Sequence, residues 1–228
     1  MKDVIISLKD ITVDFYSNSS ENFSFKKFLL TRKLLPQKVK IFEGFSLDIY
    51  EGEILGIEGS NGIGKTTLLS VMAGIIPITS GQRVVKGRAL PLLGLGHVFH
   101  GDLDIGKNIE LWALSFNSGF VVTDEFITDV LNSAGLNIKK DMLLRSLSSG
   151  LKSRLAFELA MRGNEDILLL DEVFSVGDAS FKAQSIQRIK DKLQKISCAV
   201  IVSHDRSVLE DNCSRIIRIK SKSEFEVC

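Results

Sequence analysis

Gly59-Ser60-Asn61-Gly62-Ile63-Gly64-Lys65-Thr66-Thr67 is the stretch that decides how this chain folds. It fits the pattern G-x-x-x-x-G-K-[ST] of a phosphate-binding loop. Residues 53–58 before it are mostly apolar and β-capable, and residues 66–73 after it place leucine and methionine on one helical face ahead of Gly74. A glycine-rich turn with a chance lysine would explain neither the full pattern nor the strand and helix around it.

This loop predicts a phosphate site with a role for magnesium. Its glycines let several backbone N–H groups point inward, and the start of the following helix adds partial positive charge. Lys65 supplies a full charge, and the Thr66 hydroxyl can ligate Mg²⁺. The residues predicted to bind the ligand are Gly59, Asn61, Gly62, Gly64, Lys65, Thr66 and Thr67.

The composition is that of one globular domain. The chain has 228 residues, of which 44% are hydrophobic, and 29 basic residues balance 28 acidic ones to a net charge of +1. This balance does not favour attraction to nucleic acid or to anionic lipid. The three cysteines follow no metal spacing and suggest a reducing compartment. No signal-peptide layout and no apolar run of about 18 residues is seen, so a membrane role would require another chain.

Two continuous apolar runs predict buried strands of a parallel sheet. They are Ile167–Leu170, which ends in Asp171 and Glu172, and Cys198–Val202, which ends in Ser203 and His204. Strands and helices alternate here, as in a doubly wound sheet, where ligands bind at the carboxyl ends of the strands. We therefore expect Asp171, Glu172, His204 and the phosphate loop to meet at one edge.

Each of these side chains has a chemical role in that setting. Asp171 suits an indirect or water-bridged contact to Mg²⁺, and Glu172 can polarise an attacking water molecule. His204 suits a contact to the terminal phosphate, and Lys65 completes the predicted catalytic group. The competing interpretations are an acidic turn after a strand and an ordinary core histidine.

The remaining segments predict further elements. Residues 4–15 indicate one strand or two, residues 45–50 a half-buried strand, and residues 214–219 and 223–227 edge strands. Residues 26–40 are basic with interleaved leucines, which fits a surface excursion or a contact surface for a membrane partner. Residues 95–162 are mostly helical and lie between two βα halves, 1–94 and 163–228, within the single domain 1–228.

One more segment indicates which class of phosphate-loop protein this is. Ser148-Ser149-Gly150 lies where a helix is expected to start, near Ser149, and by itself indicates only an N-cap. In order with the phosphate loop, Asp171-Glu172 and His204, it resembles the signature of ATP-binding-cassette (ABC) transporter ATPases. The resemblance covers nearly the whole chain. It implies an α/β fold with a P-loop NTPase (RecA-like) core, an antiparallel β subdomain and an inserted α-helical subdomain.

The resemblance also implies a mechanism. It makes the protein an ATPase that uses ATP and Mg²⁺, with Glu172 as the catalytic base and His204 as the switch histidine. Residues 175–178 would be the D-loop, and Phe15 or, less favoured, Tyr16 would stack on adenine. Two copies would pair head to tail, so that Ser148, Ser149 and Gly150 of one close on ATP held by the other.

A finer resemblance concerns the substrate. Residues 148–157, 171–179 and 95–109 look like the polysaccharide-export ATPases, which move lipid-linked O-antigen, capsule or teichoic-acid chains. The implied partner is a separate polytopic permease at the cytoplasmic face of the cell membrane, which makes this subunit peripheral. The chain ends too soon for the additional carbohydrate-binding domain of many O-antigen members, so the short capsule type is expected. The alternatives are another transported substrate, a soluble non-transport ABC protein, and a stand-alone P-loop kinase or GTPase.

The chain departs from the family in its loop before the helical block. No glutamine occurs between Gln82 and Gln184, so the usual loop glutamine is missing, and Lys107 stands where glutamate is common. Gly177 replaces a frequent leucine. His100, or less favoured His97, is a candidate for the place of the glutamine, because a neutral imidazole can accept a hydrogen bond as an amide carbonyl does. Both histidines could equally be ordinary loop residues.

Overall fold

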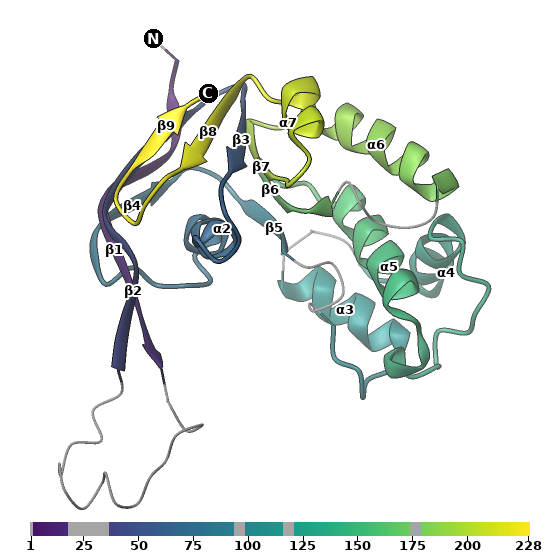
Figure 1. Ribbon diagram of the computed structural model, residues 1–228. Coiled ribbons are helices and arrows are strands. Elements are labelled where there is room, and N and C mark those ends of the chain that lie inside the picture. Colours follow the sequence, from purple (N-terminus) through teal and green to yellow (C-terminus); the bar gives the residue numbers. More distant parts are fainter. Residues whose placement is uncertain (1, 18–36, 94–98, 116–120, 174–178) are drawn as a thin grey trace, which may run out of the picture.

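The computed structural model describes residues 2–17, 37–93, 99–115, 121–173 and 179–228 (Figure 1). Its larger sheet has the order β5-β6-β7-β3-β8-β9. These strands are β3 (Glu53–Glu58), β5 (Ala89–Leu93), β6 (Ile167–Asp171), β7 (Cys198–Val202), β8 (Arg215–Ile219) and β9 (Phe225–Val227). All neighbours are parallel except β9, which runs antiparallel to β8. The predicted α/β class with a parallel sheet is confirmed.

A second, antiparallel sheet has the order β2-β1-β4. Its strands are β1 (Val4–Ser17), β2 (Gln37–Tyr50) and β4 (Ser80–Val85). The expectation of one strand or two in residues 4–15 resolves to one long strand, and the strand expected at 45–50 begins already at Gln37. The basic excursion falls mostly on residues 18–36, which lie outside the described residues.

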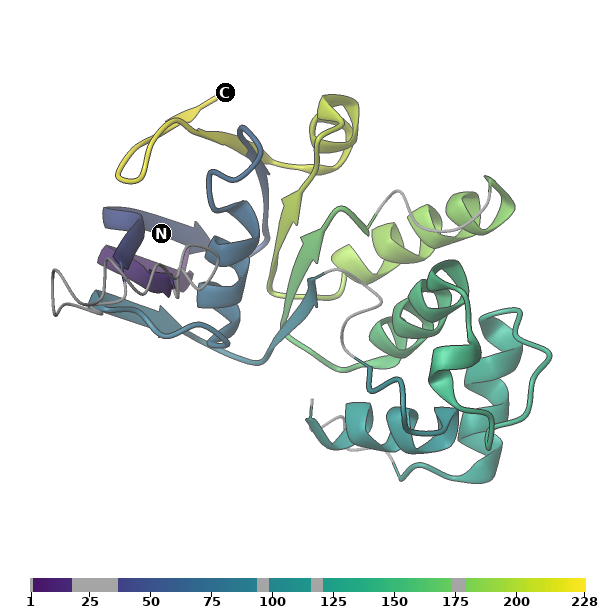
Figure 2. The same cartoon turned by 60° about the horizontal axis from the view of Figure 1, so that its bottom comes forward.

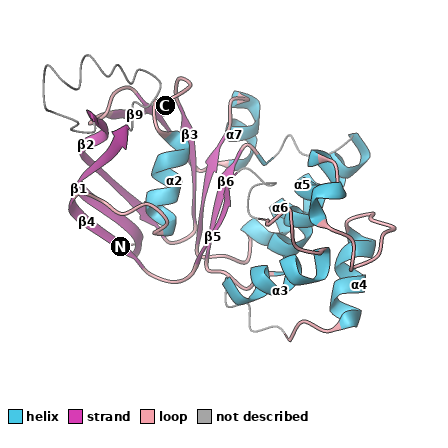
Figure 3. Ribbon diagram, turned by 90° about the horizontal axis from the view of Figure 1, so that it is seen from below, coloured by secondary structure: helices cyan, strands magenta, loops and turns pink. Residues whose placement is uncertain are grey.

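The helices are α2 (Lys65–Ala73), α3 (Ile105–Ser115), α4 (Asp124–Ser133), α5 (Ser149–Arg162), α6 (Ala179–Leu193) and α7 (Arg206–Asn212). A short 3-10 turn, Leu144–Ser146, precedes α5. Figure 3 shows α2 between the two sheets, and Figure 2 shows the helices of residues 105–193 (teal to green) on the far side of the large sheet from the antiparallel one. The boundaries of a helical block at 95–162 stay a prediction.

The two strands β6, up to Leu170, and β7 are continuously apolar because both of their faces are covered. Along β6, Ile167 and Leu169 pack into the core that contains α2 and the antiparallel sheet, whereas Leu168 and Leu170 pack into the core on the helical side. Cys198–Val202 divides in the same alternating way. A strand with period-two side chains between two apolar layers needs an apolar residue at every position.

One prediction about the sheet is wrong. Residues 214–219 were expected to form an edge strand, but β8 lies between β3 and β9, with Ile216 and Ile217 buried. The strand pairs in parallel with the strand that leads into the phosphate loop. Its polar ends, Arg215 and Arg218, make ion pairs with Glu53 and Glu58 of that strand. These ion pairs explain how charged residues fit an interior strand.

Candidate functional site

The glycines of residues 59–64 allow the chain to turn from β3 into α2. Gly64 caps α2 with a φ of 108°, in the left-handed region that side chains rarely adopt. A Cβ at Gly64 would stand 2.8 Å from Ile41 Cγ2 and 3.0 Å from Phe42 Cζ. The loop is therefore pressed against β2, and the first N–H groups of α2, which lack partners inside the helix, face outward from its start.

Lys65 begins α2 and is buried, with 8% of its surface exposed. Its ammonium Nζ donates to the carbonyl oxygens of Gly59, at 2.8 Å, and Ser60, at 3.1 Å. The charge thus lies across the loop of its own chain, where an anionic group held by the loop would meet it.

Thr66 and Asp171 are 105 positions apart and meet at the end of β6. The Thr66 hydroxyl donates to Asp171 Oδ2 at 2.6 Å. A hydroxyl and a carboxylate are oxygen donors of the hard type that Mg²⁺ prefers. The donor set therefore fits the magnesium ion that the sequence implies.

Glu172 follows β6 and turns back toward the neighbouring strand. Its φ is 55°, left-handed, and its backbone N–H donates to the Val202 carbonyl at 3.1 Å. His204 Nε2 lies 3.6 Å from Glu172 Oε1. Burial raises the pKa of the Glu172 carboxyl above its ordinary value; the His204 charge and backbone N–H and the Lys65 charge act to lower it, and Asp171 to raise it. The carboxylate is thus a stronger base than an exposed one.

These groups line one pocket of about 450 Å³ at the carboxyl ends of β3, β6 and β7. The lining residues are Ile41, Asn61, Gly62, Gly64, Lys65, Thr66, Thr67, Asp171, Glu172 and His204. All but Ile41 were predicted from the sequence. Gly59 is not part of the lining, but its carbonyl holds Lys65.

Ile41 is the site residue that sequence reasoning missed. In the pairing of β1 with β2, Val13 faces Phe42 and Asp14 faces Lys40, so Ile41 is the extra residue of a bulge. The bulge turns this side chain toward the phosphate loop. The adjacent apolar pair Ile41-Phe42, which interrupts the alternation of β2, is the signal that could have revealed it.

Phe15, the predicted adenine contact, does not line the pocket. It pairs with Val39 across the two strands, and the two side chains are 40% and 41% exposed. Phe15 follows Val13 at period two and Val39 faces it across the strands, so the pair continues the sheet face that covers the phosphate loop. The side chain of Tyr16 lies outside the described residues, and the role of Phe15 stays a prediction.

Ser148, Ser149 and Gly150 also stand apart from the pocket. The Ser148 hydroxyl caps α5 by accepting from the Leu151 N–H at 3.3 Å. All three residues are exposed, and a Cβ built on Gly150 would meet no atom within 4 Å. Within one chain these residues present an open surface and do not reach its own phosphate loop. The predicted D-loop, residues 175–178, lies outside the described residues.

His100 is exposed and does not line the pocket, and His97 lies outside the described residues. The backbone of His100 is held by Asn108 of α3, whose side chain is 2% exposed. Asn108 Oδ1 accepts from the His100 N–H at 2.8 Å, and Nδ2 donates to the His100 carbonyl at 3.0 Å. Sequence reasoning missed this anchoring role. The replacement of glutamine by His100 stays a prediction.

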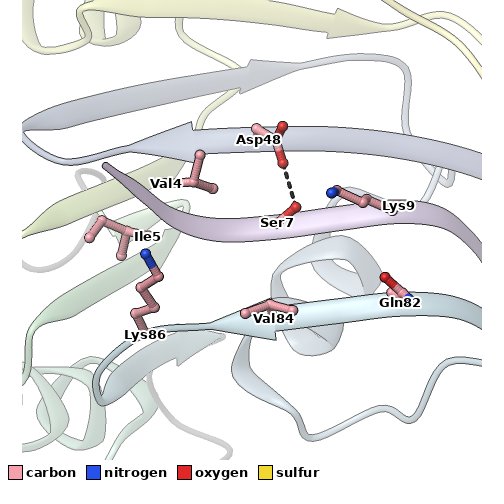
Figure 4. A pocket seen from close by; sticks show the side chains of 8 residues that line it. All are labelled: Val4, Ile5, Ser7, Lys9, Asp48, Gln82, Val84 and Lys86. Atoms are coloured by element: carbon pink, nitrogen blue, oxygen red, sulfur yellow. Dashed lines mark hydrogen bonds between the residues drawn. The ribbon is translucent and has the colours of Figure 1, made fainter. Parts of the chain in front are cut away.

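A second hollow, of about 250 Å³, lies on the outer face of the antiparallel sheet (Figure 4). The Ser7 hydroxyl donates to Asp48 at 2.5 Å on its floor. Its other lining residues are Val4, Ile5, Lys9, Gln82, Val84 and Lys86. The hollow is lined by no glycine-rich loop and by no strand of the parallel sheet, so it is not the phosphate site.

None of the helices in the described part of the chain combines the length and the apolar character that crossing a bilayer requires.

Comparisons with known proteins show which family this chain resembles. The family model described as ABC transporter matches residues 42–175. The teichoic acids export ATP-binding protein TagH of Listeria monocytogenes is 29% identical over 95% of this chain, which spans 64% of that relative's length. The O-antigen export system ATP-binding protein RfbE of Yersinia enterocolitica is 32% identical over 82% of this chain and 79% of its own length.

A solved structure shares the fold. The dimeric post-hydrolysis form of the ATP-binding cassette MJ0796, bound to ADP and Pi, superposes with a TM-score of 0.74 at 21% identity. The superposition covers 97% of this chain and 98% of that one. With the phosphate loop, the strand-end carboxylates and the matched model in agreement, the chain belongs to the ABC transporter family.

Proposed function

We propose that this chain is the ATP-binding and ATP-hydrolysing subunit of a polysaccharide exporter. It acts as a pair of copies on a separate polytopic permease, at the cytoplasmic face of the cell membrane, and drives export of a lipid-linked chain of the capsule, O-antigen or teichoic-acid type. The observation that carries the ATPase role is the pocket that joins Lys65, Thr66, Asp171, Glu172 and His204. The similarity to teichoic-acid and O-antigen export proteins supports the substrate class.

The phosphate groups of ATP are bound by backbone N–H groups of residues 59–67 and by Lys65. Donors aligned at the start of α2 favour anionic oxygens, and the ammonium moves from the carbonyls of Gly59 and Ser60 to the phosphates. Thr66 and Asp171, which are joined by a hydrogen bond, would hold Mg²⁺, and the ion would neutralise phosphate charge.

Glu172 is the base that takes a proton from the attacking water. Burial raises the pKa of its carboxyl, which makes it more basic than a solvated glutamate. His204, 3.6 Å away, contacts the terminal phosphate and stabilises the charge that develops during transfer. The left-handed turn at Glu172 directs the carboxylate toward the pocket rather than along the strand.

Adenine is held by apolar residues of the two long strands. Phe15 and Val39 extend the face on which Ile41 borders the pocket. Stacking on an aromatic ring contributes roughly 1–3 kcal/mol per base in nucleic-acid sites, and we expect Phe15 to act on this scale.

The second copy completes the site. Ser148, Ser149 and Gly150 are exposed and lie outside the pocket of their own chain. In the proposed head-to-tail pair they close on ATP held by the other copy. An exposed serine pair at the start of a helix suits this task, because hydroxyl groups and the N–H groups of the first turn all donate to anionic oxygen.

The test is the substitution Glu172→Gln. We expect ATP binding within a few-fold of the wild-type affinity and hydrolysis reduced at least a hundredfold, so that ATP holds two copies together. Lys65→Ala should instead weaken ATP binding, because it removes a charge-assisted phosphate contact. Nucleotide titration, steady-state phosphate release and light scattering measure these effects. Near-normal hydrolysis by Glu172→Gln would remove Glu172 from the role of base.

A further inference from the structure

Three helices meet at one carboxylate outside the pocket. Glu158 of α5 has no exposed surface. Its Oε2 accepts from Arg162 Nη1 at 2.6 Å and from Arg188 Nη2 of α6 at 3.0 Å, and its Oε1 accepts from Arg188 Nη1. Arg162 continues to Asp129 Oδ2 of α4 at 2.7 Å. Glu158 is therefore the hub of an ionic cluster that joins α4, α5 and α6.

Aromatic contacts link α5 and α6 beside this cluster. The rings of Phe157 and Phe181 lie edge to face with centroids 5.6 Å apart. Arg154 lies 4.8 Å above the Phe181 ring, and Arg188 lies 5.5 Å above the Phe157 ring. The contact thus runs from Phe181, close to the start of α6, to Arg188 further along it. These ring contacts and the ionic cluster share Arg188 and together join α5 to α6.

α5 and α6 are each connected to one part of the proposed catalytic site, α5 to the exposed serines and α6 to the hydrolytic carboxylates. α5 begins at the exposed Ser149, directly after Ser148, and Glu158 lies further along the same helix. α6 follows Asp171 and Glu172 along the chain, after residues 174–178. In Figure 1 the two helices lie side by side, and the α5–α6 contact agrees with that view. Any slide of α5 along α6 would therefore move the serines relative to the hydrolytic carboxylates.

The presence of an ion pair between α5 and α6 favours a positioning role for Glu158. An ion pair between a buried carboxylate and partly exposed guanidinium groups contributes little to stability compared with apolar residues of similar volume. The ion pair instead fixes the relative orientation of α5 and α6. A guanidinium that donates both Nη groups to one carboxylate permits a single rotation and register of the two helices. An apolar contact between α5 and α6 would hold them together without fixing that register.

We propose that Glu158 is a positioning residue for the ATP-driven pairing of two copies: through Arg188 and Arg162 it holds α5 in the register that presents Ser148–Gly150 to the ATP of the other copy. This proposal rests on the proposed function and deepens it. It assigns to Glu158 an effect on pairing and on kcat, with no effect on how one copy binds ATP, since the phosphate loop lies in the other core.

The test is Glu158→Gln, which keeps the volume and one acceptor but removes the charge that both arginines share. Single-copy ATP affinity is measured with a fluorescent ATP analogue at protein concentrations below pairing. Pairing is measured by sedimentation with ATP in the Glu172→Gln background. We expect affinity within twofold of the parent, pairing weakened at least fivefold, and kcat reduced with little change in KM.

Glu165→Gln is the matched control. Glu165 is buried and pairs with Lys192 of α6 at 3.1 Å, but it lies in the loop after α5 and is not in the cluster of Glu158. We expect Glu165→Gln to lower Tm by about as much as Glu158→Gln does and to leave pairing intact. A second variant, Glu158→Met with Arg188→Met, keeps an apolar α5–α6 contact. It should restore Tm but not pairing.

Two results overturn the proposal. One is wild-type pairing and kcat in Glu158→Gln; the other is loss of pairing in Glu165→Gln and Glu158→Gln in proportion to their loss of Tm. A failure of the proposed function gives a different result. In that case the Glu172→Gln parent, with Glu158 unchanged, would bind ATP without pairing, and the proposal for Glu158 would be overturned as well.

Discussion

At the scale of single residues, Glu172 is constrained by its backbone and by its surroundings. It adopts a left-handed φ of 55° immediately after a buried strand, and burial raises the pKa of its carboxyl. Glycine adopts such backbone angles without strain, whereas glutamate does so at a cost on the order of 1 kcal/mol. The site thus holds Glu172 in a backbone geometry that costs conformational free energy and in surroundings that disfavour the charged form of its carboxyl.

The raised pKa has a consequence for stability. Because the folded state binds the proton of Glu172 more tightly than the unfolded state, this residue stabilises the fold below its unfolded pKa, near 4.5, and that contribution is lost as pH rises through the folded pKa. Glu172→Gln removes the effect. We expect the Tm of the variant relative to wild type to be higher at pH 7.5 than at pH 4.5, by differential scanning calorimetry.

Glu226→Gln is a control of opposite sign. The bond with Lys220 lowers the pKa of the Glu226 carboxyl, so this group contributes stability above its unfolded pKa. The variant should therefore lose Tm relative to wild type as pH rises from 4.5 to 7.5. Parallel shifts in the two variants would show that burial of Glu172 does not set its titration.

At the scale of elements, the helix that carries Lys65 is stabilised from outside. The last turn of α2 contains no basic residue, and the helix ends at Gly74 with a φ of 78°. Arg83 of β4 donates Nη2 to the Met72 carbonyl at 2.5 Å. A cation that bonds the last carbonyls of a helix stabilises its dipole. The antiparallel sheet therefore supports the end of the phosphate-binding helix opposite the site.

Arg83→Ala tests this support. We expect a loss of about 1–2 kcal/mol in the free energy of unfolding, from the charge-assisted bond and the helix dipole. Urea denaturation measures it, with Gln82→Ala, an exposed neighbour on the same strand, as the control. A loss equal to that of Gln82→Ala would mean that the Gly74 cap alone ends the helix.

At the scale of the whole molecule, the proposed site is divided between two copies. Each chain offers a pocket at the sheet edge and, apart from it, the exposed serines at the start of α5. A composite site of this kind predicts complementation between chains that are defective in different halves. Lys65→Ala disables the pocket but keeps the serines, whereas Ser149→Arg keeps the pocket and blocks the serines.

Each of these variants alone should hydrolyse ATP poorly. Mixed in equal amounts, they should regain on the order of a quarter of wild-type activity, because half of the pairs are mixed and each mixed pair has one intact site of two. Phosphate release over a range of mixing ratios measures this. A mixture no more active than the average of its components would contradict the head-to-tail pair.

The sequence by itself determined the phosphate loop and the residues at the strand ends. A glycine-rich loop between an apolar strand and a helix is a local pattern, and so are Asp171-Glu172 and His204 after apolar runs. Parallel strands end at the same edge, so neighbouring strand ends bring these residues into one pocket once the class of sheet is known. This is why nine of the ten lining residues were predictable.

Only the tertiary structure decided the rest, because it depends on pairing between distant segments. The place of β8 inside the sheet, the bulge that turns Ile41 into the pocket, and the anchoring of His100 by Asn108 have no periodic signal of their own. Glu158 reads as an ordinary polar position on a helix until Arg188, 30 residues away, is placed against it. Local patterns specify elements, whereas register, strand order and buried charge pairs follow from how those elements pack.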